Sequence, residues 1–162
     1  MSKFKTRSGK TVDLNQNNFK AQGGEGKIYI VGDTVYKVWE SGKMIPEKKI
    51  NELNVLDHPK IIRPEDILLD SKNKVVGYTM KLVPDNAVPL AQILTRTYRD
   101  REGVTPQCMN ELVKQIADGI RFIHKKPGYL QVDGNEFNYM VTGKHDHVYF
   151  IDVNSFQTPS FP

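Results

Sequence analysis

The feature that most constrains the fold lies in residues 27–39, where two short segments of alternating apolar and polar residues are separated only by Gly32-Asp33. A two-residue connection of this kind is typical of a tight β-hairpin. We therefore predict strands at 27–31 and 34–39. Lys37 then lies within the second strand, and a lysine buried in a sheet needs a partner. Alternation alone leaves open a second arrangement, in which the Lys37 side chain faces solvent.

A glycine-rich turn, "GGEG", precedes this hairpin and places three glycines in four positions. Glycine lets backbone N–H groups approach phosphate oxygens because no Cβ stands in the way. By itself, such a turn is more simply explained as a flexible hairpin tip. Lys37 follows it after one strand and one tight turn, a spacing that can bring the ammonium beneath the glycines. Together the two features indicate a binding site for an anion.

The composition is that of a globular protein with a mild excess of positive charge: 38% of the residues are hydrophobic, 26% are charged, and the net charge is +4. This charge suits an anionic ligand such as phosphate, a nucleotide or nucleic acid. The basic residues are dispersed, and their densest stretch, 95–101, is typical of a solvated helix face. We expect a cytoplasmic protein without membrane association, because no apolar run could cross a bilayer, no signal peptide is visible, and Cys108 is the single cysteine.

Periodicity and turn residues indicate the remaining elements. We expect a strand or a loose arm over the first dozen residues, a helix at 44–57, strands near 66–70 and 75–83, a linker at 84–89, a helix at 105–126, and short strands at 137–142 and 147–152. The longer helix is predicted from the capping pair Thr105-Pro106 and from an apolar stripe formed by Met109, Leu112, Val113, Ile116, Ile120 and Ile123. The tip of the last hairpin, "GKHDH", is expected to be exposed to solvent. This is an α+β plan in two parts, 1–83 and 84–162.

Two carboxylates on the helix at 44–57 are candidates to pair with Lys37. Glu52 has Leu56 one turn later, so it lies beside the apolar face of the helix. Glu47 lies nearer the start of the helix, where the helix dipole favours a carboxylate in any case. We prefer Glu52 and keep Glu47 as the alternative.

Polar residues also gather around the two short strands near the end of the chain. Asp133 and Asn138 lie on the loop that leads into the first strand, and Asp152 ends the second. Carboxylate and amide oxygens at adjacent strand ends can hold a hard cation. Another aspartate nearby can accept a proton from a hydroxyl group. Taken singly, each of these residues is an ordinary turn former.

The order of these features resembles that of the protein kinases: a glycine turn, a strand lysine, a helix glutamate, "HP", "GYTMKLVP", "FIH", D-x-x-x-x-N and "ID". The resemblance covers about residues 19–157 and is greatest to the compact, divergent kinase-like proteins of bacteria and phages. It implies a protein-kinase-like bilobal α+β fold, with an antiparallel N-lobe sheet, one N-lobe helix, and a truncated, mainly helical C-lobe that carries the catalytic hairpin. It also implies ATP and Mg²⁺ as cofactors.

The resemblance assigns a role to each candidate residue. The nucleotide-binding set would be Gly23, Gly24 and Gly26 over the phosphates, Lys37 on the α- and β-phosphates, Met80 at the back of the adenine pocket, and Lys81 to Val83 as the hinge. The catalytic set would be Lys37, Glu52, which orients it, and Asp133, the base. The metal ligands would be Asn138 and Asp152.

The chain departs from the kinase pattern at several positions. Ala21 stands where the first glycine would be, and Gln131-Val132 replaces the His-Arg pair before the base. Asn135 replaces the lysine that eukaryotic-type protein kinases place two residues after the base and use on the transferred phosphate. Val153-Asn154 replaces Phe-Gly, and asparagine tolerates the left-handed backbone that this turn would need.

We therefore expect an ATP–Mg²⁺-dependent phosphotransferase acting on a hydroxyl group, of the Ser/Thr type, with the acceptor unidentified. A catalytically inactive, nucleotide-binding pseudokinase is the alternative, and a basic nucleic-acid-binding domain is a third, disfavoured by the dispersed charge. The sequence ends before any activation segment, so a complete chain and a fragment both stay open. Phe156 and Phe161 have no evident core, and we expect an exposed apolar patch around the final hairpin and the tail. This patch would drive self-association, or belong to a partner or to a C-terminal segment absent from this chain.

Overall fold

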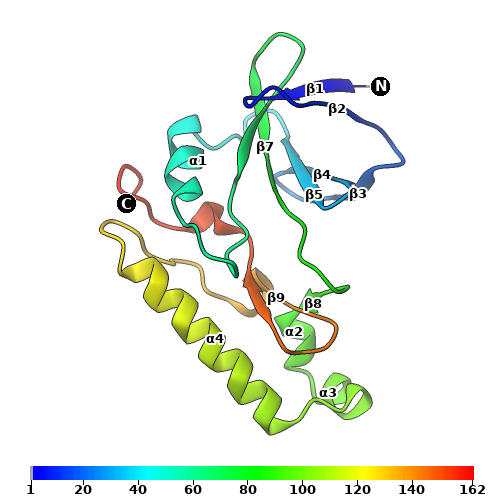
Figure 1. Ribbon diagram of the computed structural model, residues 1–162, viewed down its shortest axis with the longest axis vertical. Coiled ribbons are helices and arrows are strands. Elements are labelled where there is room, and N and C mark those ends of the chain that lie inside the picture. The colour runs from blue at the N-terminus through cyan, green and yellow to red at the C-terminus, as the bar shows by residue number, and fades with distance from the viewer. Residues whose placement is uncertain (1) are drawn as a thin grey trace. The chain divides into compact units, whose positions relative to one another are not determined.

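The computed structural model describes residues 2–162 and shows an α+β protein (Figure 1). The chain forms two compact units. The first combines the segment that ends at Val55 with Arg63–Leu82, and the second combines Leu56–Ile62 with Val83–Pro162. No helix in the described part of the chain is long and apolar enough to cross a membrane.

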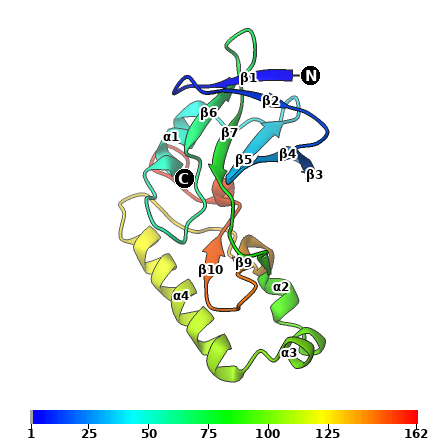
Figure 2. The same cartoon turned by 45° about the vertical axis from the view of Figure 1, so that its right-hand side comes forward.

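The first unit is a seven-stranded antiparallel sheet with the strand order β2-β1-β6-β7-β5-β4-β3. Its strands are β1 (Ser2–Thr6), β2 (Thr11–Leu14), β3 (Phe19–Gln22), β4 (Gly26–Val31), β5 (Thr34–Trp39), β6 (Asp66–Leu69) and β7 (Val75–Lys81). The two edge strands, β2 and β3, are joined by residues 15–18 alone. Such a connection reaches about 18 Å, whereas six strand spacings in a flat sheet span about 29 Å. The sheet therefore has to curl, as Figure 2 shows.

The predicted hairpin is confirmed by β4 and β5, which pair from Gly26 with Trp39 to Val31 with Thr34. Gly32 has φ +62° in the connecting turn, a backbone conformation that glycine adopts at low cost. Within the first dozen residues, which the sequence left open between a strand and an arm, Ser2–Thr6 form β1 and Thr11 begins β2. The pairing of β1 with β6 gives this segment its place in the sheet.

One helix, α1 (Glu47–Asn54), packs on one face of this sheet and is shorter than the predicted 44–57. Pro46 lies at its N-cap, and Ile50 joins Trp39 and Tyr78 in a buried cluster between the helix and the sheet. Fully burying a side chain such as Ile50 contributes about 1.5–3 kcal/mol. The opposite face of the sheet has its own cluster, formed by Val12, Leu14, Tyr36 and Leu68.

The second unit contains a small sheet and three helices among its described residues. Its elements are β8 (Val88–Pro89), α2 (Leu90–Ile93), α3 (Arg96–Glu102), α4 (Pro106–His124), β9 (Tyr139–Val141) and β10 (Val148–Phe150), with short 3₁₀ turns η1 (Glu136–Asn138) and η2 (Val153–Ser155). The strand order is β10-β9-β8, and all three strands are antiparallel. The predicted final hairpin is thus confirmed, whereas α2 and β8 were not foreseen.

The predicted helix at 105–126 is confirmed as α4, with the Thr105 hydroxyl accepting a hydrogen bond from the Cys108 backbone N–H. The helix packs tightly on β10, because a Cβ built at Gly119 would lie 2.4 Å from the Phe150 ring. Leu112 and Ile123 are buried, as the apolar stripe predicts. Val113 is 59% exposed, so its assignment to the buried face was wrong.

The basic stretch at 95–101 forms α3, as the helix-face interpretation predicts, but one residue in it is buried. Tyr98 is 8% exposed, and its hydroxyl lies 2.9 Å from His145 Nε2 at the tip of the last hairpin. His147 is exposed as expected, but His145 is half-buried. The expectation that the whole tip is solvated was therefore wrong for His145, because Tyr98 covers it.

The C-terminal tail folds back on the segment after α4, which contradicts the expectation that Phe156 has no core. Gln157 pairs with Leu130, and Phe156 is only 1% exposed. Two apolar side chains are instead exposed on the preceding loop: Val132 at 64% and Phe137 at 65%. Of the patch expected around the hairpin and the tail, the exposed side chains therefore lie on the loop just before β9, whereas Phe156 of the tail is buried.

Candidate functional site

Lys37 is buried in β5 and faces the α1 side of the sheet, as does Trp39 two residues later. The Lys37 side chain is 10% exposed, and its Nζ lies 2.5 Å from Glu25 Oε2 in the glycine turn. The Tyr78 ring from β7 lies beneath the ammonium, with 6.0 Å from Nζ to the ring centroid. The solvent-facing arrangement that the sequence left open is therefore excluded. A carboxylate offsets the cost of burying this charge.

The glycine turn joins β3 to β4, and its three glycines differ in their surroundings. A Cβ at Gly26 would lie 2.2 Å from the Val38 carbonyl oxygen, so strand pairing itself requires glycine there. At Gly23 and Gly24 a Cβ would meet nothing within 4 Å. The turn is closed by a hydrogen bond from the Gly23 N–H to the Gly26 carbonyl oxygen, 2.9 Å long. Only Gly23 and Gly24 leave open space for a ligand beside the backbone.

The two candidate glutamates on α1 lie in different environments. Glu47 is at the first position of the helix, and its Oε1 lies 2.5 Å from Arg7 Nη2. Glu52 is half-buried on the helix that packs on the same face of the sheet as Lys37. Burial lowers the pKa of Lys49, and the Glu52 carboxylate partly offsets this effect. The pairing of Glu52 with Lys37 stays a prediction.

The candidate adenine-binding residues lie at the end of β7. Met80 is half-buried and packs against the cluster that contains Trp39 and Ile50. Lys81 is exposed, pairs its backbone with Thr34, and holds its Nζ 3.7 Å from Glu65 Oε1. Val83 is the first residue of the second unit after β7. Their roles stay predictions.

Asp133 is exposed on the loop before β9, and two asparagine amides hold it. Asn135 Nδ2 donates to Asp133 Oδ1 over 3.0 Å. Asn138 Nδ2 donates to the Asp133 backbone carbonyl oxygen over 2.5 Å. Asn135 Oδ1 in turn accepts a hydrogen bond from the Phe137 N–H, which fixes the orientation of its amide. The carboxylate is thus positioned, while water still reaches it.

Asn138 and Asp152 lie at paired strand ends, as the sequence predicts. The Asn138 carbonyl oxygen accepts the Ile151 N–H over 2.9 Å, which places Asp152 directly beyond the pairing of β9 with β10. Asp152 has φ +56°, a left-handed conformation that costs a non-glycine residue roughly 1–2 kcal/mol. The sequence placed the tolerance for this conformation at Asn154. That was wrong, because Asn154 lies within η2 and Asp152 adopts the positive φ.

These two residues fit Mg²⁺. The Asn138 amide nitrogen is engaged by Asp133, so its Oδ1 is the end left for a ligand, and the Asp152 carboxylate is exposed. Mg²⁺ is held by few protein oxygens and keeps several waters or phosphate oxygens. Within residues 2–162, no group of three or more His, Cys, Asp or Glu side chains could hold a metal ion.

Sequence reasoning missed two residues that shape these regions. Glu25 stands between Gly24 and Gly26 and was treated as part of the turn, although its carboxylate contacts Lys37. Gln131 stands where the kinase pattern has the histidine of its His-Arg pair, and its Nε2 donates to the Tyr139 hydroxyl over 2.9 Å, which ties the loop to β9. The position of Glu25, one strand and one turn before Lys37, was the signal that could have found it.

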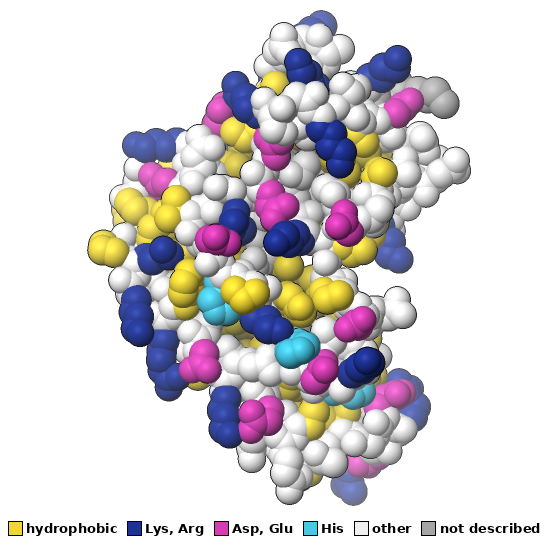
Figure 3. Space-filling model, viewed as in Figure 1, with side chains coloured by type: hydrophobic (Ala, Val, Ile, Leu, Met, Phe, Trp, Pro, Cys, Tyr) yellow, Lys and Arg dark blue, Asp and Glu magenta, His cyan; other side chains and the backbone are white. Residues whose placement is uncertain are grey.

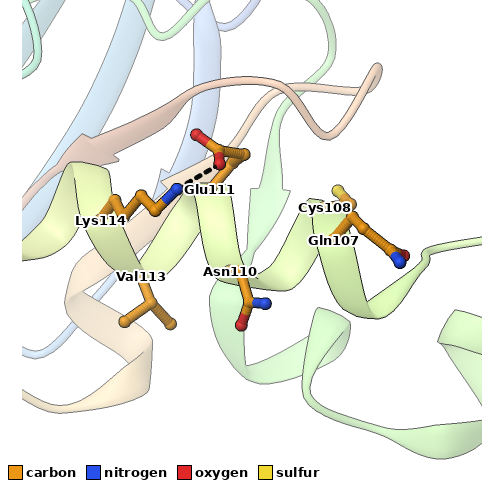
Figure 4. Close-up of a pocket in the computed structure, with 6 residues that line it drawn as sticks. All are labelled: Gln107, Cys108, Asn110, Glu111, Val113 and Lys114. Atoms are coloured by element: carbon orange, nitrogen blue, oxygen red, sulfur yellow. Dashed lines mark hydrogen bonds and ion pairs between the residues drawn. The ribbon is translucent and has the colours of Figure 1, made fainter.

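A shallow pocket on α4 is a separate feature, and Figure 4 shows the side chains that surround it. All of them come from this one helix: Gln107, Cys108, Asn110, Glu111, Val113 and Lys114. Glu111 and Lys114 pair with each other over 2.7 Å. No candidate site residue lines the pocket. On the face shown in Figure 3, acidic and basic side chains are interspersed, in keeping with the dispersed charge of the sequence.

Comparison with models of known protein families gives no match to this chain. Comparison with curated protein sequences likewise gives no significant match.

Proposed function

We propose that this chain has a protein-kinase-like fold, binds ATP with Mg²⁺, and transfers the γ-phosphoryl group to a hydroxyl group of the Ser/Thr type. The observation that carries the proposal is the buried Lys37 ammonium, 2.5 Å from a carboxylate in a glycine-rich turn. A lysine with no function beyond solubility would be favoured on the exposed face of a strand, because desolvating an ammonium costs several kcal/mol. A ligand phosphate explains why the charge is kept there.

Each set of residues has a task in this proposal. Lys37 and the backbone N–H of Gly24 bind phosphate oxygens, and Gly23 and Gly24 leave the space that these oxygens need. Asn138 Oδ1 and the Asp152 carboxylate hold Mg²⁺, which when bound neutralises charge on the phosphate oxygens. The exposed Asp133 carboxylate accepts the proton of the acceptor hydroxyl.

In the proposed transfer step, one bond forms and one bond breaks at the γ-phosphorus. The hydroxyl oxygen forms a bond to the γ-phosphorus as the bond between that phosphorus and the β,γ-bridging oxygen breaks. The proton passes from the hydroxyl to Asp133, and ADP leaves with the electron pair of the broken bond. Asn135 and Asn138 keep Asp133 in place during this step through the two hydrogen bonds that they donate to it.

Nucleotide binding without transfer is the second candidate, and Asn135 favours it. This residue stands where eukaryotic-type protein kinases have a lysine for the transferred phosphate, and its amide is engaged with Asp133. Phosphate binding by Lys37 would be retained in such a pseudokinase, but the γ-phosphoryl group would lose one stabilising cation.

The deciding experiment measures binding and transfer in parallel. MgATP is expected to raise the melting temperature, by mass action on the folded state, and Asp152→Ala is expected to remove the Mg²⁺-dependent part of that rise. Incubation with γ-labelled ATP, alone and with cell extract, then reports transfer, with Asp133→Asn as the variant that should bind but not transfer. Binding without label in any acceptor would favour the pseudokinase. No melting shift with any nucleotide at millimolar concentration would overturn both candidates.

A further inference from the structure

The ion pair between Glu25 and Lys37 joins two unequally exposed side chains. The Lys37 side chain is 10% exposed, whereas that of Glu25 is 53% exposed. The ammonium is therefore fixed inside the first unit, and the carboxylate occupies the side of it that opens to water. Because the Glu25 carboxylate lies 2.5 Å from the Lys37 ammonium, a phosphate that contacts this ammonium also lies beside the carboxylate.

The backbone around Glu25 is held on both sides. The Glu25 carbonyl oxygen accepts the Glu40 N–H over 3.1 Å, and Gly23 is bonded to Gly26 across the turn. Gln22 Nε2 also donates to Glu40 Oε1 over 2.7 Å, which ties the start of the turn to the residue after β5. A change at this pair is thus a rotation of the Glu25 side chain rather than a movement of the turn.

We propose that Glu25 is a specificity-determining residue that makes Lys37 select phosphates whose charge is already offset by Mg²⁺. This inference rests on the proposed function, because it assigns the ligand of Lys37. A metal-free polyphosphate in contact with Lys37 brings its full negative charge beside the Glu25 carboxylate. Like charges that share one partner repel each other strongly in a partly buried site. A phosphate bound to Mg²⁺ carries less net negative charge, so Glu25 repels it less. It can therefore share the Lys37 ammonium with Glu25, or replace Glu25 as the partner of this ammonium, more easily.

The chain offers a matched control for this proposal. Glu40→Gln removes the same single negative charge from the same turn region, but the Glu40 carboxylate contacts the neutral Gln22 amide. Glu25→Gln removes the charge that faces Lys37. Any general effect of net charge on anion binding appears in both variants, and the selective effect appears in Glu25→Gln alone.

The test is calorimetric titration of each full-length variant with ATP in EDTA, ATP with Mg²⁺, and metal-free tripolyphosphate. Glu25→Gln is expected to tighten metal-free ATP and tripolyphosphate roughly tenfold and MgATP by no more than about threefold. Glu40→Gln is expected to match the wild type. Adding Lys37→Met to Glu25→Gln should abolish the gain, since the ammonium is the group that Glu25 masks. Glu25→Ser serves as a second neutral variant should Glu25→Gln fold poorly.

The outcomes separate this inference from the proposed function. The proposed role of Glu25 is overturned if the wild type binds MgATP and Glu25→Gln prefers metal-bound over metal-free ATP to the same degree as the wild type. That result would leave the proposed nucleotide binding intact. Equal weakening of all three ligands in Glu25→Gln also overturns it, because Glu25 would then only orient Lys37. The absence of binding to every variant overturns the proposed function itself.

Discussion

Lys37 and Asp133 are the central charged residues of the two units, and the chain holds them in opposite ways. Lys37 is buried in the middle of a seven-stranded sheet, between β4 and β7. Asp133 is exposed on a loop, held by amides two and five residues later. In the proposed reaction the lysine has to stay charged and fixed, whereas the aspartate has to exchange a proton. The position of Lys37 therefore depends on the whole sheet, whereas the position of Asp133 depends on a few residues close to it in the sequence.

The largest effect is expected from Lys37→Met, because it removes the charge that we propose binds phosphate and keeps the apolar stem. We expect phosphoryl transfer to fall roughly 10²–10³-fold, as when a charge-stabilising donor is removed. The melting temperature should change little, since the Glu25 carboxylate that is left behind is half-exposed. Lys27→Met, at an exposed position of β4, is the matched control. Equal transfer rates in wild type and Lys37→Met would show that Lys37 takes no part in phosphoryl transfer.

Gly77→Ala tests how far the Lys37 position depends on the sheet. A Cβ at Gly77 would lie 1.8 Å from the Lys37 carbonyl oxygen, so β5 and β7 would have to separate. We expect a loss of roughly 3 kcal/mol in the free energy of unfolding, measured by urea denaturation. Gly24→Ala, where a Cβ meets nothing within 4 Å, should stay close to wild type. Similar stabilities for both variants would contradict the close approach of the two strands.

Asn135 tests the local way in which Asp133 is held. We expect Asn135→Ala to lower kcat roughly tenfold with an unchanged nucleotide Kd, because it frees the Asp133 carboxylate to rotate. Asn135→Ser retains an oxygen that can accept the Phe137 N–H but has no amide to donate to Asp133. If Asn135→Ser were as active as wild type, capping of the loop, and not positioning of Asp133, would be the role of Asn135.

The smallest effect concerns pH and the second unit. His58 Nδ1 accepts the Lys60 N–H over 3.1 Å, and the ring lies 4.8 Å from the Phe122 ring on α4. Burial, assisted by the Lys60 charge, lowers the pKa of His58. The unfolded chain therefore binds the proton more readily, and stability should fall as the pH drops below about 6.5. The decline levels off below the pKa of the folded state.

Melting curves between pH 7.5 and 5 check this prediction, and His58→Phe should flatten the dependence over that window. A wild-type curve as flat as that of His58→Phe would show that protonation of His58 is not linked to folding.

Elements with strong local signals could be predicted from the sequence. Gly32-Asp33 located the β4–β5 hairpin, and Thr105-Pro106 located the start of α4. The failures involve contacts between residues far apart in the chain. Phe156 is buried because the tail pairs with Leu130. No sequence pattern near Phe156 indicates that the tail pairs with this residue.

The candidate site residues also fall into two groups: those whose positions follow from local sequence signals, and those whose positions depend on distant parts of the chain. The positions of Asn138 and Asp152 at paired strand ends follow from a hairpin that the sequence shows. The burial of Lys37 depends on the curl of the sheet and on α1, and its Glu25 contact depends on the register of β3, β4 and β5. Alternation in one strand cannot reveal which of its faces is covered.

The segment Leu56–Ile62 has a consequence for synthesis on the ribosome. Ile61 and Ile62 are 4% and 6% exposed, and this segment pairs with Phe150, which is translated near the other end of the chain. At about 5–20 residues per second, the nascent chain carries the two isoleucines without their final partner for several seconds. All strands of the first unit are synthesised before β10. The two chain segments that make up this unit are, however, joined by Leu56–Ile62, which lacks its pairing partner until β10 is synthesised. A ribosome pause before β10 would prolong the exposure of this apolar segment to chaperones and to other nascent chains.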